Sequence, residues 1–145
     1  MEPQSPTSAT RFAVIACTKA KRSHPAKAVD LYSASPLFRK SREQADGDGL
    51  PVLVLSTKYG LIDGQLVIAP YERTFETMTP QDRRDWDALV DAQVDHFCVD
   101  RQISEVVFLA GTSYREAVRS RFEGRGVRTS VHPRWRAICD EAFGR

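Results

Sequence analysis

Three short, continuous apolar runs constrain the fold of this chain most strongly. They span residues 12–17, 52–56 and 106–110. A strand with one face in water alternates apolar and polar residues, whereas a strand covered on both faces is apolar throughout. The three runs therefore predict buried strands of one sheet. A fourth segment, residues 127–131, alternates and is expected nearer to a sheet edge.

Helix signals fall between these runs. Ser35 followed by Pro36 predicts an N-cap and a first-turn proline for a helix that ends near residue 45. Thr79, Pro80 and Asp82 predict the start of a longer helix, with the Asp82 carboxylate near the positive end of its dipole. Apolar residues then recur at three- and four-residue spacing: Trp86, Leu89, Val90, Val94 and Phe97. This spacing predicts one apolar face along the second helix.

Two further helices are expected after the third apolar run. Ser113 is the expected cap of one, which ends near Gly124, and Pro133 is expected to open a terminal helix that runs through Phe143. Strands that alternate with helices indicate a mainly parallel sheet of about four strands, with helices on both faces. We therefore expect an α/β fold, a single three-layer Rossmann-like sandwich. Residues 59–78 lack strong periodicity and are expected to form a long functional loop.

The size and composition fit one globular domain. The chain has 145 residues, of which 41% are hydrophobic and 28% charged, which suits a single core. Residues 11–145 are expected to form the α/β domain and residues 1–10, polar with two prolines, a flexible tail. No apolar stretch approaches the roughly 20 residues that cross a bilayer, and the start lacks a signal-peptide pattern. We expect a cytoplasmic protein without a membrane partner.

No cofactor or metal is predicted. The three cysteines are too far apart for a disulfide framework or a Cys-x-x-Cys site, and reduced thiols are expected: Cys17, Cys98 and Cys139. The three histidines are too dispersed for a metal triad by spacing: His24, His96 and His132. The phosphate-loop and dinucleotide glycine motifs are both absent. Nothing in the sequence indicates the oligomeric state.

Positive charge is unevenly distributed, although the net charge is only +2. Within the C-terminal third, seven arginines lie close together between residues 115 and 136: Arg115, Arg119, Arg121, Arg125, Arg128, Arg134 and Arg136. They indicate either a basic face for nucleic acid or scattered solvated side chains.

Residues suited to binding an anion follow the apolar runs. In open α/β sheets ligands bind at the carboxyl ends of the strands. Lys19 and Lys21 follow the first run, Lys58 the second and Gly111 the third, so we expect one composite pocket for a phosphate-bearing ligand. Gly111 permits close backbone approach, and the backbone amides after it are expected to face the anion: those of Thr112, Ser113 and Tyr114.

Tyrosines are the expected contacts for a base. Tyr59, beside the flexible Gly60, and Tyr71, stiffened by Pro70, offer flat faces on which a base can stack. For Tyr32 a place in the core and a ligand contact are both open.

Carboxylates and one thiol are the candidates for chemistry. Asp30 and Glu72 flank the tyrosine motifs and are the expected groups to act on water, with Asp63 a further loop carboxylate. Cys17 lies beside two lysines, which favours a reactive thiolate, whereas the alternative is a small packed side chain.

Four short motifs, taken in order, resemble a known family. They are Ala-Cys-Thr-Lys-Ala-Lys at 16–21, Asp-Leu-Tyr-Ser at 30–33, Ser-Thr-Lys-Tyr-Gly-Leu at 56–61 and Ala-Pro-Tyr-Glu at 69–72. This string resembles the YaaA peroxide-stress-protein group and its shorter bacterial and phage relatives, over about residues 12–114. The resemblance implies a fold related to the uracil-DNA-glycosylase-like sheet and an association with DNA or modified nucleobases. The chain departs from the short relatives at residues 131–136, which contain no glycine.

The expected function is a nucleotide- or nucleic-acid-directed enzyme of the N-glycosidase or base-modification type, acting in DNA stress response or phage-related modification. Lys19, Lys21, Lys58 and Ser56 would hold the ligand with the tyrosines, and DNA is favoured over RNA. The alternative is a non-catalytic nucleic-acid-binding module. A third class is a redox sensor that uses Cys17.

Overall fold

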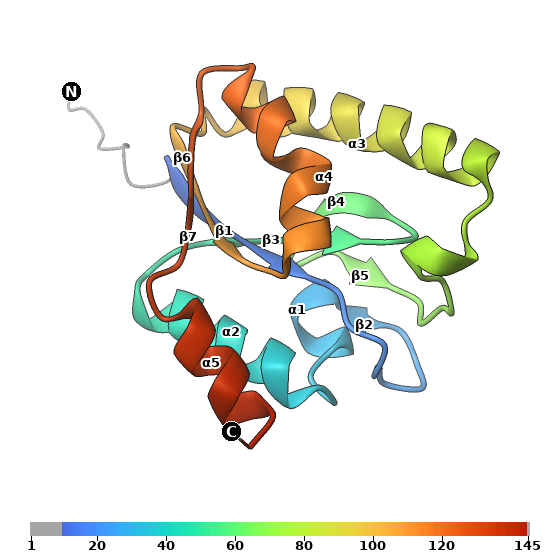
Figure 1. Cartoon of the computed structure of the whole chain (residues 1–145), viewed down its shortest axis with the longest axis vertical. Helices are drawn as coiled ribbons and strands as arrows, with labels where there is room; N and C mark the ends of the chain where they lie inside the picture. The colour runs from blue at the N-terminus through green and yellow to red at the C-terminus, as the bar shows by residue number, and fades with distance from the viewer. Residues whose placement is uncertain (1–9, 145) are drawn as a thin grey trace.

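The computed structural model describes residues 10–144 and shows a mixed α/β fold around a mostly parallel five-stranded sheet (Figure 1). The sheet order is β4-β3-β1-β6-β7. Its parallel strands are β1 (Arg11–Ala16), β3 (Val52–Ser56), β6 (Glu105–Leu109) and β7 (Arg128–Val131). The three predicted buried strands are thereby confirmed as the central neighbours β3, β1 and β6.

The remaining strands are short. β4 (Gly60–Asp63) runs antiparallel to β3 at one edge of the sheet. A separate two-stranded sheet joins β2 (Ala26–Lys27) to β5 (Val67–Ile68). Residues 59–78, predicted to be one long loop, therefore contain two short strands, and the main sheet has five strands rather than about four. The prediction was wrong because strands of four and two residues leave no measurable periodicity.

The helices begin largely where the sequence predicted. They are α1 (Ala28–Leu31), α2 (Pro36–Gly47), α3 (Pro80–Asp100), α4 (Thr112–Glu123) and α5 (Trp135–Ala142), with a 3₁₀ turn η2 (Phe75–Thr77). The Ser35 side chain accepts a hydrogen bond from the Phe38 N–H, and Thr79 and Asp82 cap each other's backbone. The cap of α4 is Gly111 rather than Ser113, so that helix begins earlier than expected.

Two apolar clusters lie against opposite faces of the central strands. Phe12 and Val14 of β1 belong to one cluster, with side chains of α3 and α4, whereas Ala13 and Ile15 belong to the other, with α1, α2 and α5. Figure 1 shows α3 and α4 on one side of the sheet and α2 and α5 on the other. Since successive strand side chains point to opposite faces, burial on both faces explains the continuous apolar runs.

The described chain is already anchored at its first residue. The Thr10 carbonyl accepts hydrogen bonds from the N–H groups of Ser104 and Glu105. The predicted flexible tail otherwise lies in residues 1–9, outside the described residues. Between residues 10 and 144, no helix combines the length and apolar character that crossing a bilayer requires.

Candidate functional site at the carboxyl edge of the sheet

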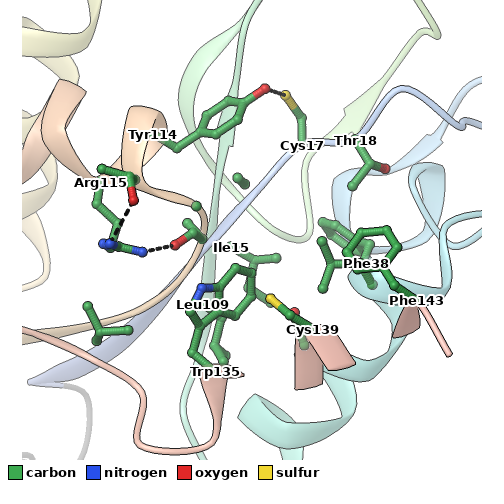
Figure 2. Close-up of a pocket in the computed structure, with 17 residues that line it drawn as sticks. Ile15, Cys17, Thr18, Phe38, Leu109, Tyr114, Arg115, Trp135, Cys139 and Phe143 are labelled. Atoms are coloured by element: carbon green, nitrogen blue, oxygen red, sulfur yellow. Dashed lines mark hydrogen bonds between the residues drawn. The ribbon is translucent and has the colours of Figure 1, made fainter. Parts of the chain in front are cut away.

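Two adjoining cavities lie where β1 and β6 end. The first, the apolar cavity, has a volume of about 440 Å³ and lies between the ends of β1 and β6 and the helices α2, α4 and α5 (Figure 2). The second, the charged cavity, has a volume of about 290 Å³ and lies between the segment after β1 and residues 72–76. Cys17, Thr18 and Tyr114 line both cavities. The two cavities therefore meet at the end of β1.

Aromatic and aliphatic side chains form most of the apolar cavity. Trp135 and Phe143 of the C-terminal segment, Phe38 of α2 and Leu109 at the end of β6 all line it (Figure 2). The first turn of α4 lies at another side of this cavity. There Arg115 donates to the Ala110 carbonyl at 2.7 Å and to the Thr112 hydroxyl at 3.1 Å (Figure 2). This guanidinium is therefore held against the start of α4.

Cationic and anionic side chains share the charged cavity. Lys19, Lys21 and Arg73 supply positive charge, and Glu72 and Glu76 supply carboxylates. Neither carboxylate makes a hydrogen bond or ion pair with any residue from 10 to 144. Both therefore remain available to a ligand or a water molecule.

Lys21 is the most constrained cation of this cavity. Its ammonium donates to the Lys19 carbonyl at 3.1 Å and lies 4.5 Å from the centre of the Tyr71 ring. Partial burial lowers the pKa of Lys21, and the neighbouring Cys17 and Glu72 oppose that change. The ammonium covers the face of Tyr71 on which a base was expected to stack.

Hydroxyl groups surround the Cys17 sulfur. The Tyr114 and Thr57 hydroxyl oxygens each lie 3.8 Å from Sγ. Thr57 donates its own proton to the Arg73 carbonyl at 2.6 Å, so it can only accept from the thiol. Cys17 is 7% exposed and lies at the junction of the two cavities.

A second hydroxyl chain lies behind the charged cavity. Ser56 Oγ accepts hydrogen bonds from the N–H groups of Lys58 and Tyr59, which leaves its proton to point at the Tyr71 hydroxyl at 2.7 Å. The Tyr71 hydroxyl lies 2.7 Å from that of Tyr32. Burial, followed by the nearby Cys17, raises the pKa of Tyr71 to about 12, and burial raises the pKa of Tyr32 even further. Tyr32 and Tyr71 are therefore neutral, interlocked supports of the cavity.

The structure brings together part of the predicted site. The predicted residues that line one or both cavities are Cys17, Lys19, Lys21, Glu72, Gly111, Thr112 and Tyr114. Tyr32, Ser56 and Tyr71 support them from behind through the hydroxyl chain. Neither cavity is lined by these three residues or by the remaining predicted ones, which are Asp30, Lys58, Tyr59, Gly60, Pro70 and Ser113.

Three of the predicted residues that line neither cavity make other contacts. Asp30 pairs with Arg42 at 2.6 Å. The Lys58 ammonium lies 5.2 Å from the centre of the Tyr59 ring, beside a smaller depression of about 190 Å³. The Tyr59 hydroxyl donates to the Ala69 carbonyl at 3.2 Å. Lys58 therefore does not join Lys19 and Lys21 in one anion clamp.

Gly60 has a conformational role. Its φ of +76° lies in the left-handed region, and a Cβ there would collide with the Gln93 side-chain amide. That amide accepts from the Leu61 N–H at 2.7 Å and donates to the Tyr59 carbonyl at 2.9 Å. Glycine is thus required for the tight connection from β3 to β4.

Sequence reasoning missed several cavity residues. These are Thr18, Arg73 and Glu76 in the charged cavity and Leu37, Ser41 and Cys139 in the apolar cavity. Thr18 and Arg73 adjoin predicted residues and could have been included. The side chains from α2 and α5 gave no signal, because only tertiary packing brings these helices to the strand ends.

The arginines of the C-terminal third are largely compensated. Arg121 pairs with Asp87 and Asp91, and Arg125 with Asp91 and Asp95, so the acids of α3 face the cations of α4. Three more of the seven arginines also form ion pairs: Arg119, Arg128 and Arg134. This arrangement favours the interpretation of solvated, paired side chains over a free basic face.

The described residues hold no cluster of His, Cys, Asp and Glu side chains with the geometry of a metal site. The candidate site therefore consists of cations, carboxylates, hydroxyl groups and one buried thiol around two cavities.

Comparison with protein families gives a match. Residues 12–134, most of the chain, match the family of unknown function DUF6884. Searches of curated proteins and of solved structures found no match.

Proposed function

The chain belongs to DUF6884, a family of unknown function, and we propose that it is a nucleotide-directed enzyme that hydrolyses an N-glycosidic bond. One observation carries this proposal. An apolar cavity and a charged cavity adjoin at the carboxyl edge of a mostly parallel sheet and share Cys17, Thr18 and Tyr114. A nucleotide has the same division into a flat, weakly polar base and an anionic sugar phosphate.

The charged cavity is the proposed phosphate subsite. Lys19 has no side-chain partner among the described residues, and Lys21 is held next to it by its bond to the Lys19 carbonyl. Lysine ammonium groups bind phosphate as point charges, and an incoming phosphate would also offset the burial that lowers the pKa of Lys21. Arg73, whose guanidinium lies 3.7 Å from Asp82, also lines this subsite.

The sugar then lies at the junction of the cavities, near Tyr114. In the proposed reaction, water attacks the anomeric carbon while the carbon–nitrogen bond breaks and the base leaves with its electron pair. The Glu72 carboxylate accepts a proton from the water, and one proton is returned to the leaving base. Water is the only co-reactant, and the products are the free base and the sugar phosphate. Glu76, the second unpaired carboxylate of this cavity, is the control position.

We also propose that the fold is a three-layer Rossmann-like sandwich related to that of the YaaA group. Its support is the pair of apolar clusters on opposite faces of β1 and the adjacency of β3, β1 and β6. Binding at the carboxyl ends of the strands is the general behaviour of such sheets. The resemblance favours damaged or modified deoxynucleotides, or DNA that contains them, as substrates.

The test is release of a free base. The purified protein is incubated with a panel of ribo- and deoxyribonucleotides and with DNA that contains modified bases, and released bases are detected by mass spectrometry. We expect release by the wild type, a loss of at least about 100-fold in Glu72→Gln, and a much smaller loss in Glu76→Gln. Tight binding without release, unaltered by Glu72→Gln, would instead identify a non-catalytic binding module.

A further inference from the structure

One buried polar side chain that lines the apolar cavity has no hydrogen-bond partner among the described residues. Ser41, in the middle of α2, is 1% exposed, and its Oγ makes no hydrogen bond with any described residue. It is the only buried side-chain nitrogen or oxygen between residues 10 and 144 in this condition. Its neighbours along the cavity include Phe38 of α2 and Trp135 and Cys139 of α5.

An unpaired buried hydroxyl is costly. Leaving it unsatisfied destabilises a protein by about 1–3 kcal/mol, and a serine inside a helix can usually bond to the carbonyl four residues earlier. Ser41 does not use the Leu37 carbonyl in this way. A ligand with a polar atom at this position would supply the missing partner.

The surroundings define the ligand. The walls near Ser41 are aromatic and aliphatic. The other hydroxyl and guanidinium groups of this cavity have partners: Thr112 and Arg115 bond to each other, Thr18 donates to the Ala20 carbonyl, and the Tyr114 hydroxyl lies 3.8 Å from Cys17 Sγ. An acyl chain would fill such a space but would leave Ser41 unpaired. A planar nitrogen heterocycle satisfies both conditions, because its faces are apolar and its edge carries hydrogen-bonding atoms.

We propose that the apolar cavity is the base subsite of the nucleotide and that Ser41 recognises the hydrogen-bonding edge of the base. This inference rests on the proposed function and extends it, because it names the residue that distinguishes a nucleobase from an apolar ring of the same shape. A hydroxyl both donates and accepts, so Ser41 selects for a polar edge rather than for one base. Neighbouring atoms cover the oxygen in this structure, so a rotation about the Ser41 Cα–Cβ bond accompanies binding.

Free bases test the subsite without the phosphate. Binding of adenine, guanine, cytosine and uracil is measured by ligand-observed NMR, with benzimidazole as a ring of purine shape that lacks the polar six-membered edge. The wild type is expected to bind at least one base more tightly than benzimidazole. Ser41→Ala should weaken the binding of that base about tenfold, as loss of one hydrogen bond does, and leave the binding of benzimidazole unchanged. Ser33→Ala is the matched control, since Ser33 pairs with Arg22 and lines neither cavity.

The outcomes separate this inference from the proposed function. If Ser41→Ala changes the binding affinities of the base and of benzimidazole equally, or changes neither, the role of Ser41 is overturned even if nucleotides are hydrolysed. Absence of binding by all four bases would overturn the base subsite. Bases that bind through Ser41, together with nucleoside monophosphates that bind no more tightly than nucleosides, would support the subsite and refute the proposed phosphate clamp.

Discussion

The Tyr71 hydroxyl lies 2.7 Å from Ser56 Oγ, and this contact joins the segment after β5 to the end of β3. Ser56 already accepts two backbone hydrogen bonds, so its proton has one direction left, toward Tyr71. The next two residues of the chain, Glu72 and Arg73, line the charged cavity. The position of the proposed catalytic carboxylate therefore depends on a contact between the buried Ser56 hydroxyl and the half-buried Tyr71.

The first prediction concerns the stability contributed by this contact. Tyr71→Phe should lower the free energy of unfolding by about 1–2 kcal/mol, because the Ser56 and Tyr32 hydroxyl groups lose their shared partner. Urea denaturation at neutral pH measures the change. Tyr59→Phe removes an exposed hydroxyl contact and should cost less. Equal costs in the two variants would show that the buried chain carries no special stability.

The second prediction concerns alkaline pH. The pKa of Tyr71 is raised from 10.0 to about 12, so the unfolded chain ionises this group at a pH where the folded chain does not. The folded state then binds more protons, and the free energy of unfolding should fall as pH rises from about 10 to about 12. The fall due to Tyr71 should be at most about 1.4 kcal/mol for each pH unit in that range. The raised pKa values of Tyr32 and Tyr114 act in the same direction.

Tyr71→Phe provides the control for this pH dependence. The difference in stability between the wild type and the variant should shrink across the alkaline range, as followed by urea denaturation at fixed ionic strength. A difference that stays constant from about pH 9 to about pH 12 would mean that Tyr71 is not a protonated, buried phenol in the folded protein.

The third prediction concerns Gly60. Gly60→Ala should be strongly destabilising, by roughly 2–4 kcal/mol, since it adds both a left-handed backbone penalty and a collision with Gln93. Gly47→Ala is the matched control, because a Cβ at Gly47, near the end of α2, meets no atom within 4 Å. That variant should be neutral or slightly stabilising in thermal denaturation. A mild effect at Gly60 would contradict the tight turn between β3 and β4.

The fourth prediction concerns the arginines of α4. Arg121 and Arg125 are occupied by the acids of α3, so alanine at both positions should leave the slope of log DNA affinity against log salt unchanged. Fluorescence anisotropy with a short duplex measures this slope. If these arginines instead contact DNA phosphates, each substitution should flatten the slope by about 0.9.

The central strands and the edge at which the site lies were predictable from sequence. A strand covered on both faces is a continuous apolar run, which is visible in the sequence. Lys19 and Gly111 follow two such strands, and they line the cavities at the carboxyl ends of the sheet. The cap at Ser35 was also predictable, because its hydrogen bond is local: the side chain accepts from the N–H of Phe38, three residues later.

Other parts of the site depend on contacts that no local pattern encodes. The Lys58 ammonium lies 5.2 Å from the centre of the Tyr59 ring and not in the charged cavity that Lys19 lines. Ser41 and Trp135 meet at the apolar cavity only because α2 and α5 pack together on the same side of the sheet. Their sequence neighbourhoods resemble those of ordinary helices.

One binding experiment tests most directly whether a single nucleotide spans both cavities. Isothermal titration calorimetry compares a nucleoside with its 5′-monophosphate for the wild type, for Lys19→Ala with Lys21→Ala, and for Trp135→Ala. If one nucleotide spans both cavities, the phosphate should strengthen binding to the wild type, and the double lysine variant should lose this gain while it still binds the nucleoside. Trp135→Ala should weaken the binding of both ligands by the same factor. A gain from the phosphate that survives loss of both lysines, or a Trp135→Ala variant that binds both ligands normally, would contradict this placement of one nucleotide.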